Sequence, residues 1–498
     1  MDAQALDDHL EPLPERTLSF RTESGLRYVY DDVSGVILPA NAGHPLGPGP
    51  LGPEDGSLEA RLARRRQAVE SRAGSPRPWT PERVRAETLT SPSLQTTLIV
   101  TERCTLRCRY CVYTGTYEHS RTHSSADMPV EVALKAVDFL VAAHREKEKH
   151  NPGRTPALGF YGGEPLLRFD LIRRVIEYAE RSGLTFSYSV TTNGTINDDD
   201  VVTYLVDKGF NVAVSLDGPP SEHDRNRVFP DGRGSAERVY GFLRKLRAAR
   251  QRLGRQGDGQ PPFVILCCTD RATDFQNVCG FFDSDPALFA DVSARVSMIY
   301  PFRTSYYDGW TEEDLRRAER TGGQLWPLYS ARLGAGALPR DLGFRDWMFG
   351  MNLRNLLYGL AMEGNPLRGT CVPGSRTAVD PSGQLHICER VNNNYPIGNL
   401  ETGLDSVLIS DLLNTAQNYF GERCRLCAVR RLCGACFSHL LVDGGTRLEI
   451  PDQYCSETPV GLRRNLSTLF SILEKNPGCA SLLMPTYSEL ERDRIFNG

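Results

Sequence analysis

The chain has 498 residues, of which 40% are apolar and 24% charged, so it can bury a large core and should hold two or three domains. Its formal net charge of −4 gives no electrostatic case for binding nucleic acid or an anionic membrane. We recognise no secretory signal segment and no apolar run of transmembrane length, so we expect a cytoplasmic protein whose fourteen cysteines are not in disulfides.

The first ninety or so residues differ in pattern from the rest. Residues 18–21 and 26–38 are predicted to form two or three short strands, a Pro- and Gly-rich connection covers 39–57, and 58–72 are predicted to form a basic helix. This extension, residues 1–92, is either a capping lid or a region that binds a peptide along an exposed strand edge.

Three cysteines follow the next apolar run, with the spacing Cys-x3-Cys-x2-Cys: Cys104, Cys108 and Cys111. Three thiolates at this spacing can hold three irons of a cubic iron–sulfur cluster and leave the fourth iron open to a substrate. A structural zinc site is the alternative, but zinc takes four ligands and no fourth Cys or His lies at the expected short distance. His119 and His123 are more simply loop residues.

From residue 97 onward, strand-like apolar runs alternate with helical segments. A helix is expected to open near Asp127 with Pro129 in its first turn. The expected strands are 98–100, 158–161, 186–190, 212–215, 263–266 and 296–300. Six such units predict an α/β fold over 93–305, and periodicity alone does not separate a partial (β/α)6 barrel from a doubly wound sheet.

Polar motifs follow three of these strands. They are Gly162, Gly163, Glu164 and Pro165 after the second strand, Asn193 and Gly194 after the third, and the run from Ser215 to Gly218 after the fourth, with His223 and Arg227 close behind. Paired glycines allow a close approach to a ligand, Glu164 suits an ammonium group and Arg227 suits a carboxylate. Each motif alone could be a plain turn or a solvated charge. The carboxyl ends of parallel barrel strands nevertheless form one site.

A second group of seven cysteines lies further along the chain: Cys371, Cys388, Cys424, Cys427, Cys433, Cys436 and Cys455. Taken alone, the pairs at 424/427 and 433/436 could form a zinc ribbon. Residues 306–365 look mainly helical, as does the tail after Cys455. The remaining cysteines are expected to be small buried side chains: Cys267, Cys268, Cys279 and Cys479.

The triad with Tyr110 before its last cysteine, the Gly-Gly-Glu-Pro, Thr-Thr-Asn-Gly and Ser-Leu-Asp-Gly runs, and the second cysteine group resemble radical S-adenosylmethionine (SAM) enzymes that carry a SPASM domain. The resemblance covers roughly 97–300 and 371–455. It implies a TIM-type partial (β/α)6 barrel, a helical bridge at 306–365, a SPASM domain at 366–460 and a helical tail at 461–498. It also implies a [4Fe–4S] cluster on the triad, with SAM contacted by Tyr110, Gly162, Gly163, Glu164, Pro165, Asn193, Ser215 and Arg227.

The same resemblance implies two auxiliary iron–sulfur clusters. Cys424, Cys427, Cys433 and Cys455 would hold one of them completely. Cys371, Cys388 and Cys436 would hold the other, which keeps an open iron or takes a non-Cys ligand. One departure is that two residues, rather than three, separate Cys433 from Cys436.

Two carboxylates are candidate bases. Glu389 stands where sulfatase-maturating relatives have an aspartate, and it is one methylene longer, so either a base or a salt bridge with Arg390 is expected. Asp380 is a lesser candidate.

Among enzymes of this kind we expect a peptide maturase. A 5′-deoxyadenosyl radical would take hydrogen from a ribosomally made, leader-bearing precursor peptide and a crosslink would form, with a Cys thioether as the first candidate. A flavodoxin or a ferredoxin-type protein would supply electrons. The alternatives are carbon–carbon (cyclophane) crosslinking or epimerisation, formylglycine formation on sulfatases, action on a small metabolite, and a nonenzymatic iron–sulfur or zinc scaffold.

Overall fold

The computed structural model describes residues 13–40, 57–70, 77–91, 94–118, 122–255, 261–289, 291–361, 371–391, 395–440 and 447–483. His119 and most of the connection at 39–57 lie outside the described residues. No helix within these ranges is both long enough and apolar enough to cross a bilayer.

A ten-stranded sheet forms the centre of the molecule. Six of its strands are parallel and pair in chain order: β4 (Gln95–Thr101), β5 (Ala157–Gly162), β6 (Ser187–Thr192), β7 (Asn211–Ser215), β8 (Val264–Thr269) and β9 (Ser293–Met298). All six expected strands are present, with ends that differ by a few residues. Because the strand order never reverses, the sheet is the predicted partial barrel and not a doubly wound sheet, whose order reverses at a switch point.

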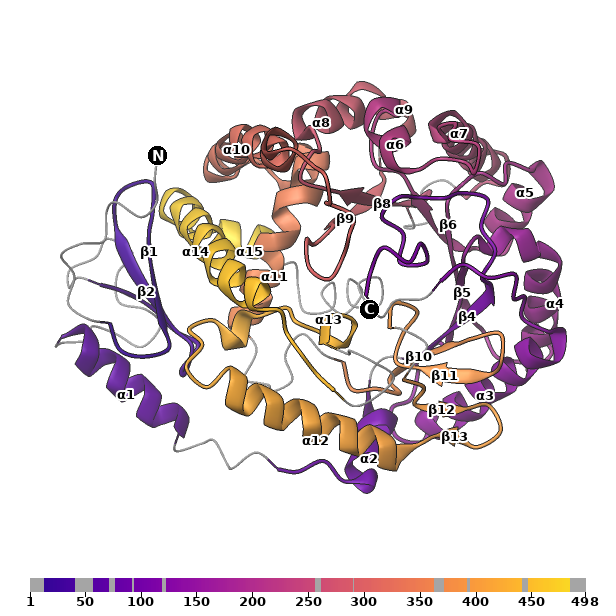
Figure 1. Ribbon diagram of the computed structural model, residues 1–498, viewed down its shortest axis with the longest axis horizontal. Coiled ribbons are helices and arrows are strands. Elements are labelled where there is room, and N and C mark those ends of the chain that lie inside the picture. Colours follow the sequence, from indigo (N-terminus) through magenta and orange to yellow (C-terminus); the bar gives the residue numbers. More distant parts are fainter. Residues whose placement is uncertain are drawn as a thin grey trace.

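Helices cover the outer side of this curved sheet (Figure 1). They are α3 (Val130–Glu148), α4 (Phe169–Glu180), α5 (Asp199–Asp207), α6 (Pro220–Asn226), α7 (Ala236–Arg252), α8 (Phe275–Ser284) and α9 (Pro286–Phe289). Pro129 is the N-cap of α3 and lies just before its first turn. Alternate strand residues such as Phe160, Val190 and Val214 are buried in the main core under these helices. Their neighbours along each strand therefore face the barrel interior.

The second cysteine region continues the barrel sheet. Strand β10 (Arg376–Val379) pairs parallel with β4, in the register Val379 to Leu98. It carries an antiparallel extension of β11 (Gln384–His386), β12 (Gly398–Asn399) and β13 (Gly403–Leu404). The region then continues through α12 (Ser406–Arg423), the 3-10 turn η4 (Arg430–Leu432) and α13 (Phe437–Leu440). Strands of two to four residues are too short to show a periodic pattern. The sequence therefore did not predict the pairing of β10 with β4.

The described residues of the expected bridge and tail are mainly helical. The bridge contains α10 (Glu312–Gly334), the 3-10 helix η2 (Pro339–Leu342), the π-helical turn η3 (Asp346–Gly350) and α11 (Met351–Ala361). The tail contains α14 (Asp452–Lys475) and α15 (Cys479–Leu483). Because α14 begins before Cys455, the boundary expected between 460 and 461 falls inside a helix.

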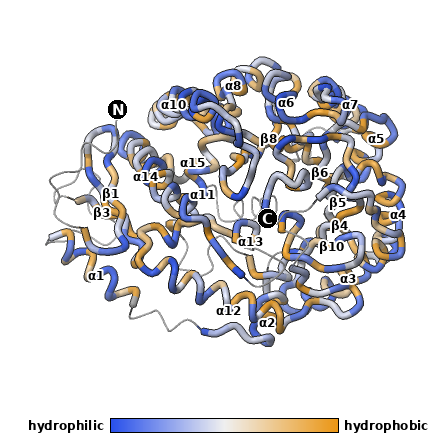
Figure 2. The backbone as a smooth tube through the Cα atoms, in the orientation of Figure 1, coloured by the Kyte–Doolittle hydropathy of each residue, from blue (hydrophilic) through white to orange (hydrophobic). Residues whose placement is uncertain are grey.

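The N-terminal extension forms a three-stranded antiparallel sheet of β1 (Thr17–Arg21), β2 (Arg27–Asp31) and β3 (Ile37–Pro39), followed by α1 (Leu58–Glu70) and α2 (Pro81–Thr90). Figure 2 shows hydrophobic stretches along this sheet and along α14 beside it. The rings of Phe20 and Tyr28 pack on Phe470 of α14, with centroids 5.3 and 4.7 Å away. The sheet is therefore held against the C-terminal helix.

Both outer strands of this small sheet contact helices. On β1, the Ser19 carbonyl accepts a hydrogen bond from Arg463 at 3.1 Å and the Arg21 carbonyl accepts one from Ser467 at 2.5 Å. On β3, the Pro39 carbonyl accepts a hydrogen bond from Arg61 at 3.0 Å. Pro39 also has no N–H to offer to an added strand.

Candidate functional site

The three cysteines of the triad lie on the loop that follows β4, at the carboxyl end of the barrel strands. They share a small apolar cluster whose buried members include Leu106, Cys108 and Tyr110. Cys104 accepts hydrogen bonds from the backbone N–H of Leu106 at 3.4 Å and from Asn193 Nδ2 at 3.5 Å. The Cys111 sulfur accepts one from the Tyr113 N–H at 3.5 Å.

Burial makes these thiols weak acids. It is the largest cause of the raised pKa of each of the three, and it raises the pKa of Cys104 to about 11. The thiols are therefore neutral without a metal, and metal binding has to displace their protons. Convergent N–H groups suit the sulfur ligands of an iron–sulfur cluster, whose potential depends on such hydrogen bonds. The triad residues fit a cluster.

The paired glycines lie against the cysteine loop. The Gly163 N–H donates to the Thr101 carbonyl and the Glu164 N–H to the Arg103 carbonyl, both at 2.8 Å. A Cβ on Gly162 would lie 2.1 Å from the Thr101 carbonyl oxygen, and a Cβ on Gly163 would lie 2.1 Å from the Arg103 carbonyl oxygen. The expected close approach is therefore made to protein backbone, and the glycines position the cysteine loop.

Glu164 is fully buried between β5 and β6. Its carboxylate accepts hydrogen bonds from Thr192 Oγ1 and the Asn193 N–H, both at 2.7 Å, and from the Leu166 N–H at 3.1 Å. Burial outweighs these bonds and raises the pKa of Glu164 to about 7. Pro165 follows as the first residue of the 3-10 turn η1 (Pro165–Arg168). A cationic ligand would stabilise the ionised carboxylate.

Tyr110, Asp217 and Arg227 form a buried group beside the triad. Arg227 Nε donates to Asp217 Oδ2 at 2.9 Å, and the Tyr110 hydroxyl donates to the same oxygen. The guanidinium carbon lies 5.2 Å from the centre of the Tyr110 ring, and Nη1 lies 3.9 Å from Cys108 Sγ. The sequence analysis did not select Asp217, although its place in the Ser-Leu-Asp-Gly run was a signal.

The other predicted SAM contacts lie at the same end of the barrel. Asn193 Nδ2 also donates to Thr105 Oγ1 at 3.0 Å, and its Oδ1 accepts from Thr195. Ser215 is the last residue of β7 and is half-buried. The fully buried His223 accepts the Asp217 N–H at 3.3 Å, and burial lowers its pKa to about 4, so the ring is neutral.

Cys268 departs from the expectation for the four remaining cysteines. Cys267, Cys279 and Cys479 are buried in the main core, as expected. Cys268 is the inward-facing neighbour of Cys267 on β8, and it packs on the apolar cluster of the triad. Its N–H donates to Asp217 Oδ1 at 2.9 Å. The alternation of β8 thus brings a fourth thiol to the barrel interior.

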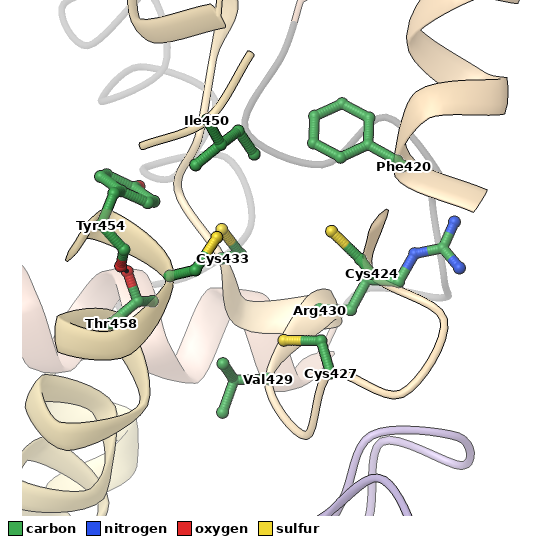
Figure 3. Close-up of a pocket in the computed structure, with 10 residues that line it drawn as sticks. Phe420, Cys424, Cys427, Val429, Arg430, Cys433, Ile450, Tyr454 and Thr458 are labelled. Atoms are coloured by element: carbon green, nitrogen blue, oxygen red, sulfur yellow. Dashed lines mark hydrogen bonds between the residues drawn. The ribbon is translucent and has the colours of Figure 1, made fainter. Parts of the chain in front are cut away.

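Four of the second-group cysteines line one pocket (Figure 3). They are Cys424, Cys427, Cys433 and Cys455, and the walls include Phe420, Val429, Ile450 and Tyr454. In Figure 3 the labelled sulfurs project into the space between these walls. Cys436, which a zinc ribbon would include, does not line the pocket. Within the described ranges, no three Cys, His, Asp or Glu side chains converge tightly enough for a single metal ion.

The other three cysteines lie at the junction of the sheet extension and α13. Cys371 is within electrostatic reach of Cys436 and Glu389, and Cys388 is within reach of Cys371. Burial would raise the pKa of Cys436, but the interactions with His439 and Ser438 together outweigh it and lower the pKa to about 7. Cys436 Sγ also lies 2.9 Å from Ser438 Oγ.

The two candidate bases have different surroundings. Asp380 lies in the turn between β10 and β11, where it accepts hydrogen bonds from Ser382, the Gln384 N–H and His386. Burial would raise its pKa, but the bonds from His386 and Ser382 lower it to about 2. Asp380 therefore stabilises the turn between β10 and β11. The Glu389 carboxylate lies 3.9 Å from Arg390 Nε. This is the salt bridge that the sequence analysis gave as the alternative to a role as base.

Comparisons with known proteins match the barrel and its order of motifs to one family. Residues 98–254 match the radical SAM superfamily. The cysteine-type anaerobic sulfatase-maturating enzyme of Clostridium perfringens is 22% identical over 352 residues, which cover 67% of this chain and 85% of that enzyme. The radical SAM cyclopropyl synthase TigE of Paramaledivibacter caminithermalis is 26% identical over 157 residues, a stretch that covers 30% of this chain and only 32% of TigE.

A solved structure described as native anSMEcpe with bound AdoMet and Kp18Cys peptide has the same fold. Its TM-score is 0.54 at 18% identity, over 78% of this chain and 99% of that one. The cysteine triad, the parallel barrel and these similarities identify a radical SAM domain at residues 98–254, in an enzyme that uses a [4Fe–4S] cluster and SAM and is similar to the anaerobic sulfatase-maturating enzymes.

Proposed function

We propose that this enzyme is a peptide maturase with a SPASM domain, which crosslinks a ribosomally made precursor peptide. Among the possible crosslinks, we propose a Cys thioether first. The observation that carries the proposal is the position of the segment 388–390. Tyr161, on the inner face of β5, is within electrostatic reach of Glu389, Arg390 and Cys111. Tyr161 therefore has both the triad and the segment that carries Cys388 in its electrostatic surroundings.

The residues near Tyr161 and Cys388 suit the binding of a peptide cysteine. When bound, the [4Fe–4S] cluster and SAM supply the radical that abstracts hydrogen from the peptide. Glu389 is a carboxylate beside Cys388 and can accept the proton of a peptide thiol as the sulfur forms its new bond. Arg390 Nε lies 3.9 Å from this carboxylate. Cys371, Cys388 and Cys436 would hold one auxiliary cluster, which would supply the acceptor for the one electron left over when the sulfur bonds to the carbon radical, and the four pocket cysteines would hold the other.

The role of the N-terminal sheet in this scheme is to cap the structure or to bind the leader of the precursor. The contacts of Arg463, Ser467 and Arg61 leave little free strand edge among the described residues, which favours a cap. We further propose a cytoplasmic enzyme that receives electrons from a flavodoxin or a ferredoxin-type protein.

Formylglycine formation is the second candidate. It is supported by the similarity to the sulfatase-maturating enzyme of C. perfringens over 67% of this chain. In that reaction a Cys or Ser of the substrate is oxidised to an aldehyde, and no crosslink forms.

Co-expression with short open reading frames encoded beside the gene, followed by mass spectrometry, tests the proposal. Loss of two hydrogens per modification, blocked when the peptide Cys is alkylated and unaffected by a hydrazide, supports a thioether. A hydrazide-reactive product supports formylglycine instead. A Cys104→Ala variant provides the inactive control. If SAM is cleaved but no encoded peptide changes, the maturase proposal is wrong.

A further inference from the structure

The N-terminal sheet contacts both of the segments that supply the four pocket cysteines. One segment is the loop from Cys424 to Cys433, which contains the 3-10 turn η4. The other is helix α14, which carries Cys455 and lies beside the sheet in Figure 1. The extension therefore joins two parts of the chain whose relative position sets the shape of the pocket.

Asp32, which directly follows β2, makes the contact with the loop. Its Oδ1 accepts a hydrogen bond from the backbone N–H of Arg431 at 2.6 Å, across 399 positions of the sequence. Arg431 is the middle residue of η4 and stands two residues before Cys433. A Cβ added to Gly35 would lie 2.8 to 2.9 Å from three atoms of the Arg431 guanidinium, so this side chain packs on the glycine. The turn after β2 thus contacts both the main chain and the side chain of Arg431.

The Asp32 carboxylate is itself held firmly in place. Its side chain is 0% exposed, and its Oδ2 accepts a hydrogen bond from Arg16 Nη2 at 2.6 Å. The Tyr30 hydroxyl donates to Oδ1 at 3.4 Å, and the Asp32 N–H donates to the Arg16 carbonyl at 3.0 Å. A buried carboxylate forms a strong hydrogen bond with a backbone N–H, and losing it would leave the donor unsatisfied. Asp32 therefore restrains η4.

Helix α14 is held by β1 and by the turn that follows it. The Glu23 N–H donates to Ser471 Oγ at 2.9 Å, and the Ser24 hydroxyl donates to Glu474 Oε2 at 2.7 Å. These bonds add to the ring contacts and the carbonyl hydrogen bonds described above for the same helix. The sheet is thus fixed to α14 on one side and to η4 on the other.

We propose that the N-terminal sheet is a structural part of the four-cysteine metal centre, and that Asp32 is the residue that positions the loop of this centre. Four cysteines around an apolar pocket are a donor set that suits an iron–sulfur cluster. Cys427 and Cys433 flank η4, so a shift of Arg431 would change the distance between their sulfurs. Residues that orient metal ligands without binding the metal typically contribute about tenfold or more to metal affinity.

This role is distinct from capping the structure and from binding a leader peptide. It rests on one part of the proposed function, namely that the four pocket cysteines hold one cluster. It does not depend on which peptide is modified or on which bond is formed.

Iron retention by the anaerobically reconstituted full chain tests the inference without turnover. Asp32→Ala removes the acceptor of the Arg431 N–H. We expect a chelator to remove iron from the four-cysteine centre at least about tenfold faster in this variant than in the unsubstituted protein. Mössbauer spectra assign the released iron, and the triad cluster should be retained.

Asp31→Ala is the matched control. The Asp31 side chain is also 0% exposed and pairs with Arg66 at 2.7 Å. Its other hydrogen bonds are to Val33 and Ser34, inside the extension. Both variants therefore remove a buried carboxylate from the same turn, but only Asp32→Ala removes a bond to the cysteine loop. The control should keep the iron of the four-cysteine centre.

A double variant separates the hydrogen bond from the charge. Asp32→Asn/Arg16→Gln removes both charges and keeps an amide oxygen that can accept the Arg431 N–H, so it should restore most of the iron retention. Equal iron release in Asp31→Ala and Asp32→Ala would overturn the inference. Unchanged release in Asp32→Ala, no recovery in the double variant, or an unsubstituted chain whose pocket cysteines hold no iron would also overturn it.

The outcome is separable from that of the maturase proposal. If Asp32→Ala loses iron as expected but no encoded peptide changes in co-expression, the positioning role stands and the maturase proposal fails. If a peptide is crosslinked while Asp32→Ala keeps its iron, the reverse holds.

Discussion

Arg227 and Asp217 form an ion pair of 2.9 Å whose side chains are only 8% and 4% exposed. The same guanidinium faces the Cys108 sulfur. Asp217 therefore fixes the cation that we expect to meet the SAM carboxylate. A guanidinium has five N–H donors, so this pairing leaves capacity for a second anion.

Removing Asp217 should destabilise the protein strongly. Asp217→Asn leaves a buried cation without its counter-charge, which typically costs about 3–5 kcal/mol in the free energy of unfolding. The double variant Asp217→Asn/Arg227→Gln should recover most of this loss. Urea unfolding of the metal-free protein measures both. The control is Asp231→Asn, whose pair with Arg233 is exposed to solvent and should change the free energy of unfolding far less. Equal losses at the two aspartates would contradict this assignment.

Gly163→Ala should displace the cysteine loop. The new Cβ would lie 2.1 Å from the Arg103 carbonyl oxygen, so the loop that carries the triad has to move. We expect loss of the triad cluster, about four irons per chain, with the auxiliary clusters retained. Iron analysis and electron paramagnetic resonance measure this. Gly280→Ala is the control, because a Cβ there meets no atom within 4 Å. Full iron content in the Gly163 variant would show that the loop tolerates the shift.

Local spacing made much of this site predictable. The triad, Glu164 and the four cysteines of the Figure 3 pocket were identified from motifs and from family resemblance. The contact between Gly163 and Arg103 was not predictable, because a motif shows that glycine is needed without showing which atom approaches it. The alternation of β8 indicates that one of two adjacent cysteines faces inward, but it does not say which.

Long-range pairing was the larger obstacle. Arg376 and Gln95 are 281 positions apart and meet only because β10 pairs with β4. Each of those strands gains its partner from tertiary packing, and a four-residue run carries no signal of its own. The hydrogen bond between Arg376 and Gln95 depends on this pairing, so the sequence alone could not show it.

SAM affinity should increase with pH up to about 7 and then level off. We expect the SAM ammonium to bind an ionised Glu164, whose pKa burial raises to about 7, so below that value each pH unit should cost up to about tenfold in affinity. Equilibrium dialysis of the cluster-loaded protein between pH 6 and 8 would measure it, and Glu164→Gln should bind weakly without this pH dependence. For folding the sign is opposite: this group's contribution to the stability of the SAM-free protein falls as pH rises from about 4.5 to about 7. An affinity that is flat across pH 7 in the unsubstituted protein would exclude Glu164 as the ammonium partner.

Cys455→Ala and Cys436→Ala should affect different metal centres. Cys455 lines the pocket with Cys424, Cys427 and Cys433, so its loss should remove about four irons from that site and leave the triad intact. Cys436 does not line this pocket, and we expect it to serve the other auxiliary cluster with Cys371 and Cys388, so its loss should affect that cluster alone. Cys279→Ala, at a buried core cysteine, should keep all the iron. Elemental analysis combined with Mössbauer spectroscopy distinguishes these cases. A zinc ribbon on the 424/427 and 433/436 pairs predicts the opposite pattern: one zinc per chain that is lost with Cys436 and retained without Cys455.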